Sequence, residues 1–230
     1  MKAMILAAGI GTRLRPLTDS RPKALVEING RTLLEITLTR LREFGINNVI
    51  INTHHFADMM ADYLRSHANF GMRITVSRED ELLDTGGGLK KASSFFDDGP
   101  FLLHNVDVLS NIDLRLLTEA HRETQALATL AVQDRRTSRY LLFDESLQLR
   151  GRAPEPDPNF VSLAFSGIHL ISPHIFDLLT EDGVFSIITA YLRLAAAGES
   201  IRGFRADNYY WRDVGKPESL AQAGAELAKL

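Results

Sequence analysis

The densest group of chemically useful residues lies in the segment 9–23, directly after the first apolar run of the chain. Glycines at positions 9 and 11 let the backbone turn sharply and bring N–H groups close to a ligand. The charged residues are four cations and one acid, a local charge of +3: Arg13, Arg15, Arg21, Lys23 and Asp19. Such cations form charge-assisted hydrogen bonds with phosphate oxygens. The segment predicts a triphosphate-binding loop, with a basic surface turn as the alternative.

Two familiar phosphate-binding loops do not fit this segment. The dinucleotide pattern G-x-G-x-x-G requires glycine where the chain has Leu14, and region 48–52 lacks the acidic residue that should follow about 20 residues later. A Walker A loop requires Gly-Lys-Ser/Thr, whereas Lys216 is followed by Pro217. A nucleotide-binding loop here therefore belongs to another fold.

Three consecutive glycines at 86–88 form a second unusual segment. Glycine is costly at the start of a helix, because it loses more conformational freedom than any other residue. Three of them allow a flat ligand to lie on the backbone, or leave N–H groups for an anion. The segment is thus a candidate base-binding wall.

Two aspartates far apart in the sequence could share a metal ion. Asp107 follows the very apolar run 101–103, and Asp213 lies in W-R-D-V-G-K-P near the C-terminus. Mg²⁺ needs only one or two protein carboxylates when substrate phosphates supply further oxygen ligands. The residues alone leave open whether each aspartate binds metal or caps a helix or turn.

The scaffold expected to position these residues is an α/β sheet. Short aliphatic runs alternate with stretches of helical period in the first half of the chain, which is typical of βαβ units. Strands are expected over 3–8, 48–52, 72–76, 101–103 and 126–132, and helices over 32–44, 56–66, 86–96 and 114–124. Ligands of open α/β sheets bind at the carboxyl ends of the strands, where the 9–23 segment and Asp107 lie.

The second half of the chain has a different texture. The pattern predicts a hairpin of 140–143 with 147–149, a connector over 150–158, a long strand over 160–171 and a second hairpin of 201–206 with 209–214. Helices are expected over 173–179, 187–197 and 218–230. The sequence shows no repeat or linker, so we expect one domain over residues 1–230.

Composition excludes several classes of protein. The chain of 230 residues has no cysteine, which excludes disulfides, a thiolate nucleophile and cysteine-bound metal centres. The formal charge is −3 and the sequence has no Lys/Arg block, so nothing in it predicts a basic surface for nucleic acid or an anionic membrane. The first apolar run ends at Gly9, too early for a membrane helix. We therefore expect a cytoplasmic protein with no nucleic-acid or membrane partner.

The motif L-A-A-G-x-G-T-R-L-x-P-L-T, followed by P-K-x-L, resembles the signature of the sugar-1-phosphate nucleotidylyltransferases. The matching positions are Leu6, Ala7, Ala8, Gly9, Gly11, Thr12, Arg13, Leu14, Pro16, Leu17, Thr18, Pro22, Lys23 and Leu25. The resemblance implies a three-layer α/β/α fold with a central mixed, mostly parallel sheet. It also implies the reaction of a nucleoside triphosphate with a sugar 1-phosphate to give a nucleotide sugar and pyrophosphate.

The resemblance assigns roles to individual residues. It implies nucleotide binding by Leu6, Ala8, Gly9, Gly11, Thr12, Arg13, Thr85, Gly86 and Gly87. Arg13 and Lys23 would be catalytic through their contacts with the reacting phosphates, and Asp107 and Asp213 would hold Mg²⁺. Sugar-phosphate binding would fall to Lys23, Asn105, Ser166 and Gly167. The nucleotide-binding half would span about residues 1–125 and the sugar-binding half about 126–230.

Two positions depart from the family pattern. Val106 stands where the family has glycine and would crowd the metal side, and Lys216 stands where it has threonine. The E-K-P lysine motif of many relatives has no clear match. Short relatives that act on N-acetylmuramate 1-phosphate also lack it, and this chain resembles them in length and in its triple glycine, with mannose-1-phosphate guanylyltransferase-like proteins also similar. UTP is therefore the favoured nucleotide.

Two alternatives stay open at this point. A cytidylyltransferase for a non-sugar phosphate such as phosphocholine has a very similar loop and differs in its acceptor. A non-catalytic nucleotide sensor would keep the loop but lose metal chemistry through Val106. In either case the expected assembly is a monomer or a small homo-oligomer.

Overall fold

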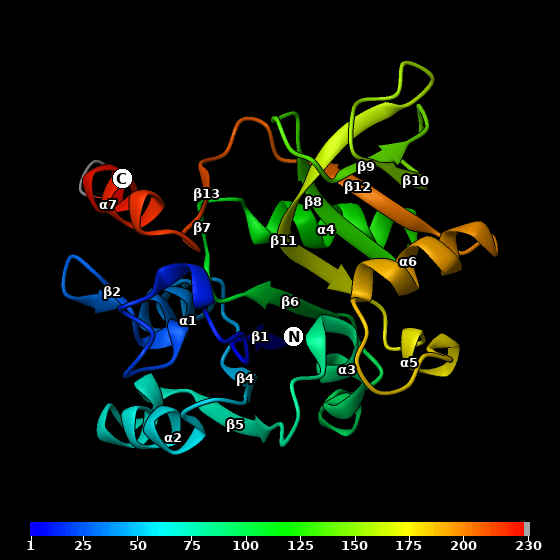
Figure 1. Ribbon diagram of the computed structural model, residues 1–230. Coiled ribbons are helices and arrows are strands. Elements are labelled where there is room, and N and C mark those ends of the chain that lie inside the picture. Colours follow the sequence, from blue (N-terminus) through cyan, green and yellow to red (C-terminus); the bar gives the residue numbers. More distant parts are fainter. Residues whose placement is uncertain (228–230) are drawn as a thin grey trace.

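The fold is built on a nine-stranded mixed sheet (Figure 1). The computed structural model describes residues 1–227. The strands of this sheet are β1 (Lys2–Leu6), β4 (Asn48–Thr53), β5 (Arg73–Arg78), β6 (Phe101–Asn105), β8 (Ala128–Gln133), β9 (Tyr140–Phe143), β10 (Leu149–Ala153), β11 (Val161–Ile171) and β12 (Ile201–Arg205). Two small sheets pair β2 (Glu27–Ile28) with β3 (Arg31–Thr32) and β7 (Val108–Ser110) with β13 (Trp211–Asp213).

Most strands of the large sheet point the same way. The neighbours β5, β4, β1 and β6 pair in parallel, and so do β8 and β12. The long strand β11 is antiparallel to β6, β8 and β9, and β10 is antiparallel to β9. Only β10 and β11 therefore run against the other strands of this sheet. The expected mixed, mostly parallel sheet is confirmed.

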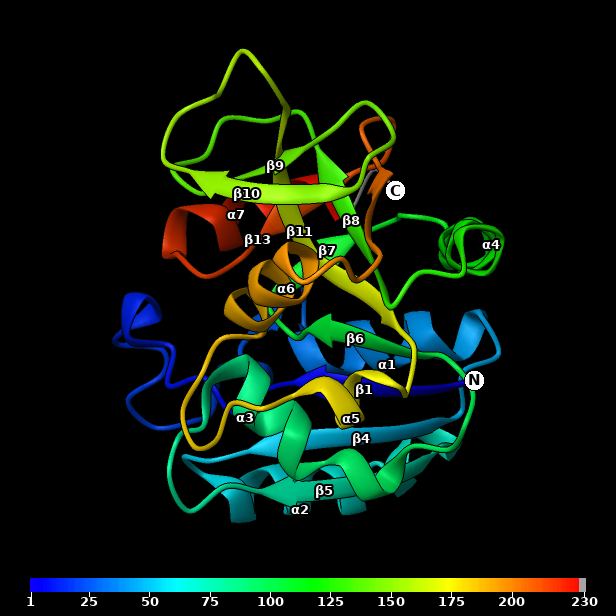
Figure 2. The ribbon, with the colours of Figure 1, turned by 90° about the vertical axis from the view of Figure 1, so that its right-hand side faces the viewer.

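Helices cover both faces of the sheet, as Figure 2 shows. They are α1 (Leu33–Glu43), α2 (Ala57–Ser66), α3 (Asp84–Lys91), α4 (Leu114–Thr124), α5 (Ile175–Leu178), α6 (Ile187–Ala196) and α7 (Pro217–Leu227). One apolar core contains side chains of α1, α2, α4 and α7, and a second contains those of α3, α5 and α6. The sheet separates these two cores, which gives the three layers expected from the sequence.

The alternation of apolar residues explains how one strand serves both cores. In β1 the side chains of Ala3 and Ile5 join the first core and Met4 joins the second, because successive side chains point to opposite faces. Local caps set the helix ends. The Thr32 hydroxyl accepts a hydrogen bond from the Glu35 amide at 3.0 Å, and Asp113 accepts one from the Arg115 amide at 2.8 Å, so each cap satisfies an amide in a first helical turn.

The second predicted hairpin is wrong. Strand β12 pairs in parallel with β8, whereas β13 pairs antiparallel with β7, so the two segments enter different sheets. The reason is tertiary: β8 and β7 offer open edges to these strands. Strand β7 was not expected from the sequence.

Other predicted elements differ mainly at their ends. Helix α4 and the pairing of β9 with β10 are confirmed, although β10 extends over residues expected to form a connector. Helix α3 begins at Asp84 and ends at Lys91, earlier than expected at both ends. The predicted end of the last helix, residues 228–230, lies outside the described residues. Among residues 1–227, no helix has the length and apolar character needed to span a membrane.

Candidate active site

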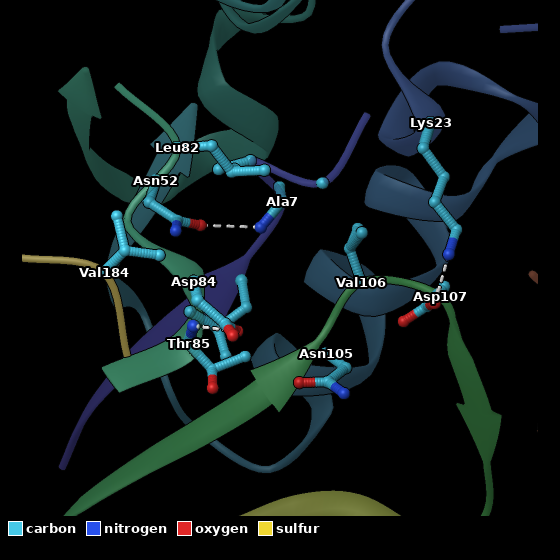
Figure 3. Close-up of a pocket in the computed structure, with 13 residues that line it drawn as sticks. Ala7, Lys23, Asn52, Leu82, Asp84, Thr85, Asn105, Val106, Asp107 and Val184 are labelled. Carbon is cyan, nitrogen blue, oxygen red and sulfur yellow. Dashed lines mark hydrogen bonds and ion pairs between the residues drawn. The ribbon is translucent and has the colours of Figure 1, made fainter. Parts of the chain in front are cut away.

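A cavity of about 370 Å³ opens at the carboxyl ends of β1, β4 and β6. Backbone and side chains from six parts of the chain line it: Leu6, Ala7, Ala8, Gly9, Lys23, Asn52, Leu82, Asp84, Thr85, Asn105, Val106, Asp107 and Val184. Figure 3 shows these residues grouped around the ends of the strands. This is the edge at which an open α/β sheet binds ligands, and the segment 9–23, expected to be a phosphate-binding loop and called the phosphate loop below, borders it.

The loop after β1 closes tightly upon itself. Gly11 has a φ of 71°, and a Cβ added there would lie 3.0 Å from Thr18 Cγ2 and 3.1 Å from Lys23 Cβ. The Thr18 hydroxyl donates to the Gly11 carbonyl at 2.8 Å. Glycine is therefore needed for both the backbone conformation and the close approach, which carries Lys23 back to the cavity.

Lys23 forms an ion pair with Asp107 (Figure 3). Their side chains are only 11% and 19% exposed, respectively. The pair joins the loop after β1 to the turn between β6 and β7. It places one cation and one carboxylate side by side at the wall of the cavity, where phosphate groups would need both charge and a metal ligand.

Asp213 lies beside Asp107 because of the small β7–β13 sheet. Asp213 is opposite Val108 in this pairing, and the Val214 amide donates to the Asp107 carbonyl at 2.9 Å. The two aspartates are far apart in the sequence, and the structure places their backbones side by side, as predicted. Asp213 Oδ1 also accepts from the Gly215 amide at 2.7 Å.

Asp107 and Asp213 both carry carboxylates, the type of ligand that Mg²⁺ prefers. The described residues contain no group of three or more acidic, histidine or cysteine side chains that could hold a metal, so a complete protein cage is not built in this part of the chain. Mg²⁺ does not require one, since substrate phosphates and water fill its remaining positions. The oxygen donors of Asp107 and Asp213 fit that mode of binding.

Arg13 lies near Asp213. It is exposed and does not line the cavity, but a Cβ on Gly215 would lie 2.7 Å from both Arg13 Nη2 and Asp213 Oδ1. The guanidinium thus stands next to the backbone beside Asp213. Thr12 is likewise exposed and outside the cavity lining.

A second cavity, of about 280 Å³, adjoins the first. Asn105, at the end of β6, borders both. The other residues that line the second cavity are Val108, Arg135, Thr137, Arg139, Leu141, Arg152, Phe165, Ser166, Gly167, Ser186, Ile188, Trp211 and Asp213. The predicted sugar-phosphate residues Asn105, Ser166 and Gly167 therefore lie together, whereas Lys23 belongs to the first cavity.

The two cavities meet where β11 approaches β6. Gly167 has a φ of 72°, and a Cβ there would lie 2.9 Å from both Asn105 Nδ2 and Val108 Cγ2. Any larger residue would push these side chains apart. The neighbouring Ser166 is fully buried, and its hydroxyl has no hydrogen-bond partner in the described part of the chain.

Arg135 is held over Trp211 at this end of the second cavity. Its guanidinium carbon lies 3.6 Å from the centre of the Trp211 ring, and Nη2 donates to the Phe165 carbonyl at 2.6 Å. Burial lowers the pKa of Arg135, and the nearby Asp213 carboxylate opposes that shift. The arginine Nε is buried and has no partner among the described residues. A cation is thus held close to the aspartate pair.

Gly86 and Gly87 do not present free amides. The amides of Gly86 and Gly87 donate to the Phe185 carbonyl at 2.9 and 3.3 Å, and neither residue lines the cavity. Of the two alternatives offered by the sequence, the one in which free N–H groups of these glycines bind an anion is therefore contradicted for Gly86 and Gly87. A Cβ on Gly86 would lie 2.9 Å from the Phe185 carbonyl oxygen, so these glycines let α3 pack closely against the segment before α6. Thr85 does line the cavity.

Val106 is both a cavity residue and a core residue. It is buried, belongs to the core that contains α1, and its amide donates to the Leu6 carbonyl at 3.1 Å. It therefore ties the turn after β6 to the start of the phosphate loop.

Several residues of the site were missed in the sequence. Asn52, which lines the first cavity, forms a buried hydrogen bond with Glu79, and Arg135, Arg139 and Arg152 line the second cavity. The run D-R-R-T-S-R at 134–139 was an available signal, because it concentrates cations before a strand. Nothing in the sequence marked Asn52, which appears there as the polar end of an apolar strand.

Comparison with known proteins gives a consistent result. The model of the family described as "Nucleotidyl transferase" matches residues 2–229. The N-acetylmuramate alpha-1-phosphate uridylyltransferase of Caulobacter vibrioides is 33% identical over 99% of this chain and 97% of that protein. The mannose-1-phosphate guanyltransferase of Yarrowia lipolytica is 32% identical over 96% of this chain, which spans 62% of that protein's length.

A solved structure shares the fold. HddC from Yersinia pseudotuberculosis, complexed with GMP-PN, superposes with a TM-score of 0.82 at 23% identity, covering 98% of this chain and 99% of that chain. At this identity the likeness shows the architecture alone.

Proposed function

Because the chain belongs to the nucleotidyl transferase family, we propose that it transfers the uridylyl group of UTP to N-acetylmuramate α-1-phosphate. The coarser activity, transfer of a nucleotidyl group to a sugar 1-phosphate, follows from the family match and from the named relatives. The choice of UTP and of N-acetylmuramate is supported by the relative from Caulobacter vibrioides, which this chain matches over nearly its whole length.

One observation carries the proposal: two cavities meet at Asn105, with Asp107 on the first and Asp213 on the second. The larger cavity begins at the phosphate loop and suits a nucleoside triphosphate. The smaller one extends from Asn105 along β11 and suits the acceptor. The acceptor phosphate and the α-phosphate would then face one another at the boundary between the cavities.

The reaction needs positioning and charge neutralisation more than covalent help from the protein. An oxygen of the acceptor phosphate forms a bond to the α-phosphorus, and the bond from that phosphorus to the bridging oxygen of pyrophosphate breaks in line. Pyrophosphate leaves with the electron pair. The acceptor phosphate is already ionised, so no side chain has to remove a proton.

Lys23 and Arg13 would supply the positive charge. Lys23 is poised at the wall of the first cavity and would exchange its contact with Asp107 for phosphate oxygens. Arg13 is exposed beside Gly215 and would turn toward the leaving pyrophosphate. Asp107 and Asp213 would hold Mg²⁺, which when bound neutralises charge on the α-phosphate.

Pyrophosphate release tests the proposal. The full chain is incubated with MgCl₂, each of UTP, CTP, GTP and dTTP, and a panel of acceptors: N-acetylmuramate, N-acetylglucosamine, glucose and mannose 1-phosphates and phosphocholine. We expect the highest kcat/KM for UTP with N-acetylmuramate α-1-phosphate. The Asp107→Asn variant provides a matched protein that retains the shape of the site without the carboxylate.

Each other outcome has a definite meaning. Preference for phosphocholine would contradict the sugar 1-phosphate assignment, and preference for GTP would contradict the assignment of the base. Nucleotide binding with no pyrophosphate release from any pair would show a sensor in place of an enzyme.

A further inference from the structure

The second cavity is lined by more positive charge than one acceptor phosphate needs for charge neutralisation. The inner end of this cavity is the end at Asn105 and Gly167, where it meets the first cavity. Three arginines line it, Arg135, Arg139 and Arg152, against a single acid, Asp213. Arg135 is fixed near Asp213 by Trp211 and the Phe165 carbonyl. The guanidinium groups of the other two form no ion pair or hydrogen bond within the chain described.

These two arginines lie away from the inner end of the cavity. Arg152 is opposite Leu141 in the β9–β10 pairing, and Leu141 is opposite Leu163 of β11. Gly167, which contacts Asn105, is four residues further along β11. At about 3.3 Å per residue in a strand, Arg152 stands on the order of 13 Å along the sheet from the Asn105 end.

Arg139 stands between these positions. It immediately precedes β9, whose first residue, Tyr140, is opposite Ala164 of β11. A phosphate held near Asn105, Arg135 and Asp213 would therefore leave Arg152 without a partner and Arg139 at the margin. A guanidinium group forms strong, often bidentate, charge-assisted hydrogen bonds with a carboxylate or a phosphate.

We propose that Arg139 and Arg152 select an acceptor that bears a second anion, a carboxylate, on the side of the sugar remote from its 1-phosphate. This inference rests on the proposed function. In N-acetylmuramate 1-phosphate the 3-O-lactyl group supplies such a carboxylate, whereas N-acetylglucosamine 1-phosphate is the same sugar phosphate without it. The two compounds form a matched pair of ligands that differ only at the position in question.

The charge of the lining supports this choice of ligand. With Asp213 committed to the aspartate pair, the cavity would present three cations to the acceptor. A sugar 1-phosphate that also carries a carboxylate brings about one more negative charge than its neutral-sugar counterpart. The inner Arg135 and the outer pair Arg139 and Arg152 would then each face an anion.

The experiment combines binding and turnover. The variants are Arg139→Gln, Arg152→Gln and the double variant, with Arg136→Gln as control, because Arg136 is exposed in the same segment and does not line the cavity. Binding of each acceptor to the full chain is measured by calorimetry, and kcat and KM are measured by pyrophosphate release. Thermal melting checks that each variant is folded.

We expect the wild-type chain to bind N-acetylmuramate α-1-phosphate at least about tenfold more tightly than N-acetylglucosamine α-1-phosphate, which is the size of one charge-assisted contact. The double variant should lose that difference through a higher KM with little change in kcat. Its affinity for the acceptor without the lactyl group should stay within about threefold, and Arg136→Gln should behave as wild type.

Equal wild-type affinity for the two acceptors would overturn the inference, as would an equal loss of both in the double variant, which would show that the arginines hold the phosphate. The proposed function fails separately, if no pyrophosphate is released with any acceptor. Discrimination in calorimetry would still establish the role of the arginines in that case. Turnover of neutral sugar phosphates with no preference would leave the transferase activity intact and refute the selectivity.

Discussion

The side-chain amide of Asn52, which lines the first cavity, donates to the buried Glu79 carboxylate at 2.7 Å. Asn52 Oδ1 also accepts from the Ala7 amide at 2.7 Å, and Glu79 Oε2 accepts from the Leu83 amide at 3.0 Å. Asn52 and Glu79 therefore join the start of the phosphate loop to the segment that leads into Thr85. Both are only 2% exposed, so their polar groups have no solvent to replace a lost partner.

Glu79→Gln should disturb this connection while preserving its shape. An amide presents only one acceptor oxygen, whereas the carboxylate accepts from both Asn52 and Leu83, so one buried donor would be left unpaired. We expect the free energy of unfolding to fall by about 1–3 kcal/mol in urea denaturation, and the KM for nucleotide to rise. Glu81→Gln, at an exposed position, should change neither quantity. Wild-type values for Glu79→Gln would disprove the coupling.

Lys23→Ala and Arg13→Ala should each lower turnover on the order of 100-fold or more, because each removes a preorganised positive charge from the reacting phosphates. Steady-state pyrophosphate release measures the effect. Arg21→Ala provides the control, since Arg21 is exposed in the same loop and lies outside both cavities. Near-normal turnover in either variant would remove that residue from the proposed mechanism.

Asp107→Asn and Asp213→Asn should raise the Mg²⁺ concentration needed for half-maximal activity by at least about tenfold, because a neutral amide oxygen is a weaker ligand for a hard cation than a carboxylate. Activity is measured over a MgCl₂ titration, and EDTA should abolish it in the wild type. Exposed Asp97→Asn is the control. An unchanged Mg²⁺ requirement in both variants would place the metal elsewhere.

Gly86→Ala should destabilise the protein by about 1–3 kcal/mol, because its methyl group would meet the Phe185 ring and lie 2.9 Å from the Phe185 carbonyl oxygen. Gly99→Ala is a suitable control, since no atom lies within 4 Å of a Cβ at that position. Urea denaturation of both variants measures the difference. Equal stability would show that α3 can move away from Phe185 at little cost.

Acidification should destabilise the fold through buried neutral histidines. Burial lowers the pKa of His104 and His169 to about 3 and that of His121 to about 4. Below pH 6.5 the unfolded chain therefore binds protons that the folded chain excludes, and stability falls as the pH falls toward 4. Each histidine contributes a slope of up to about 1.4 kcal/mol per pH unit.

The pH prediction is tested by urea denaturation between pH 7 and 4.5. Replacing His121 with Gln should reduce the slope of the unfolding free energy against pH over this range. The variant has one imidazole fewer to bind a proton when the chain unfolds. His55→Gln should leave it unchanged, since His55 is exposed. A slope that His121→Gln does not alter would assign the acid sensitivity to other groups.

The amino-acid sequence by itself determined the layers, the phosphate loop and the family resemblance. Hydrophobic period distinguishes a strand from a helix locally, so α4 and β9 were located to the residue. The spacing of glycine and cations in 9–23 also reflects a local requirement, the sharp return of the chain at Gly11. These features depend on residues near one another in the chain.

Only the tertiary structure decided which distant residues meet. The partners of β12 and β13 could not be predicted, because the choice between two open sheet edges depends on the whole sheet. For the same reason, the hydrogen bond between Asn52 and Glu79 could not be predicted from the sequence. The second cavity likewise brings together Arg135, from the segment between β8 and β9, and Arg152 of β10, and long-range packing alone fixes their spacing.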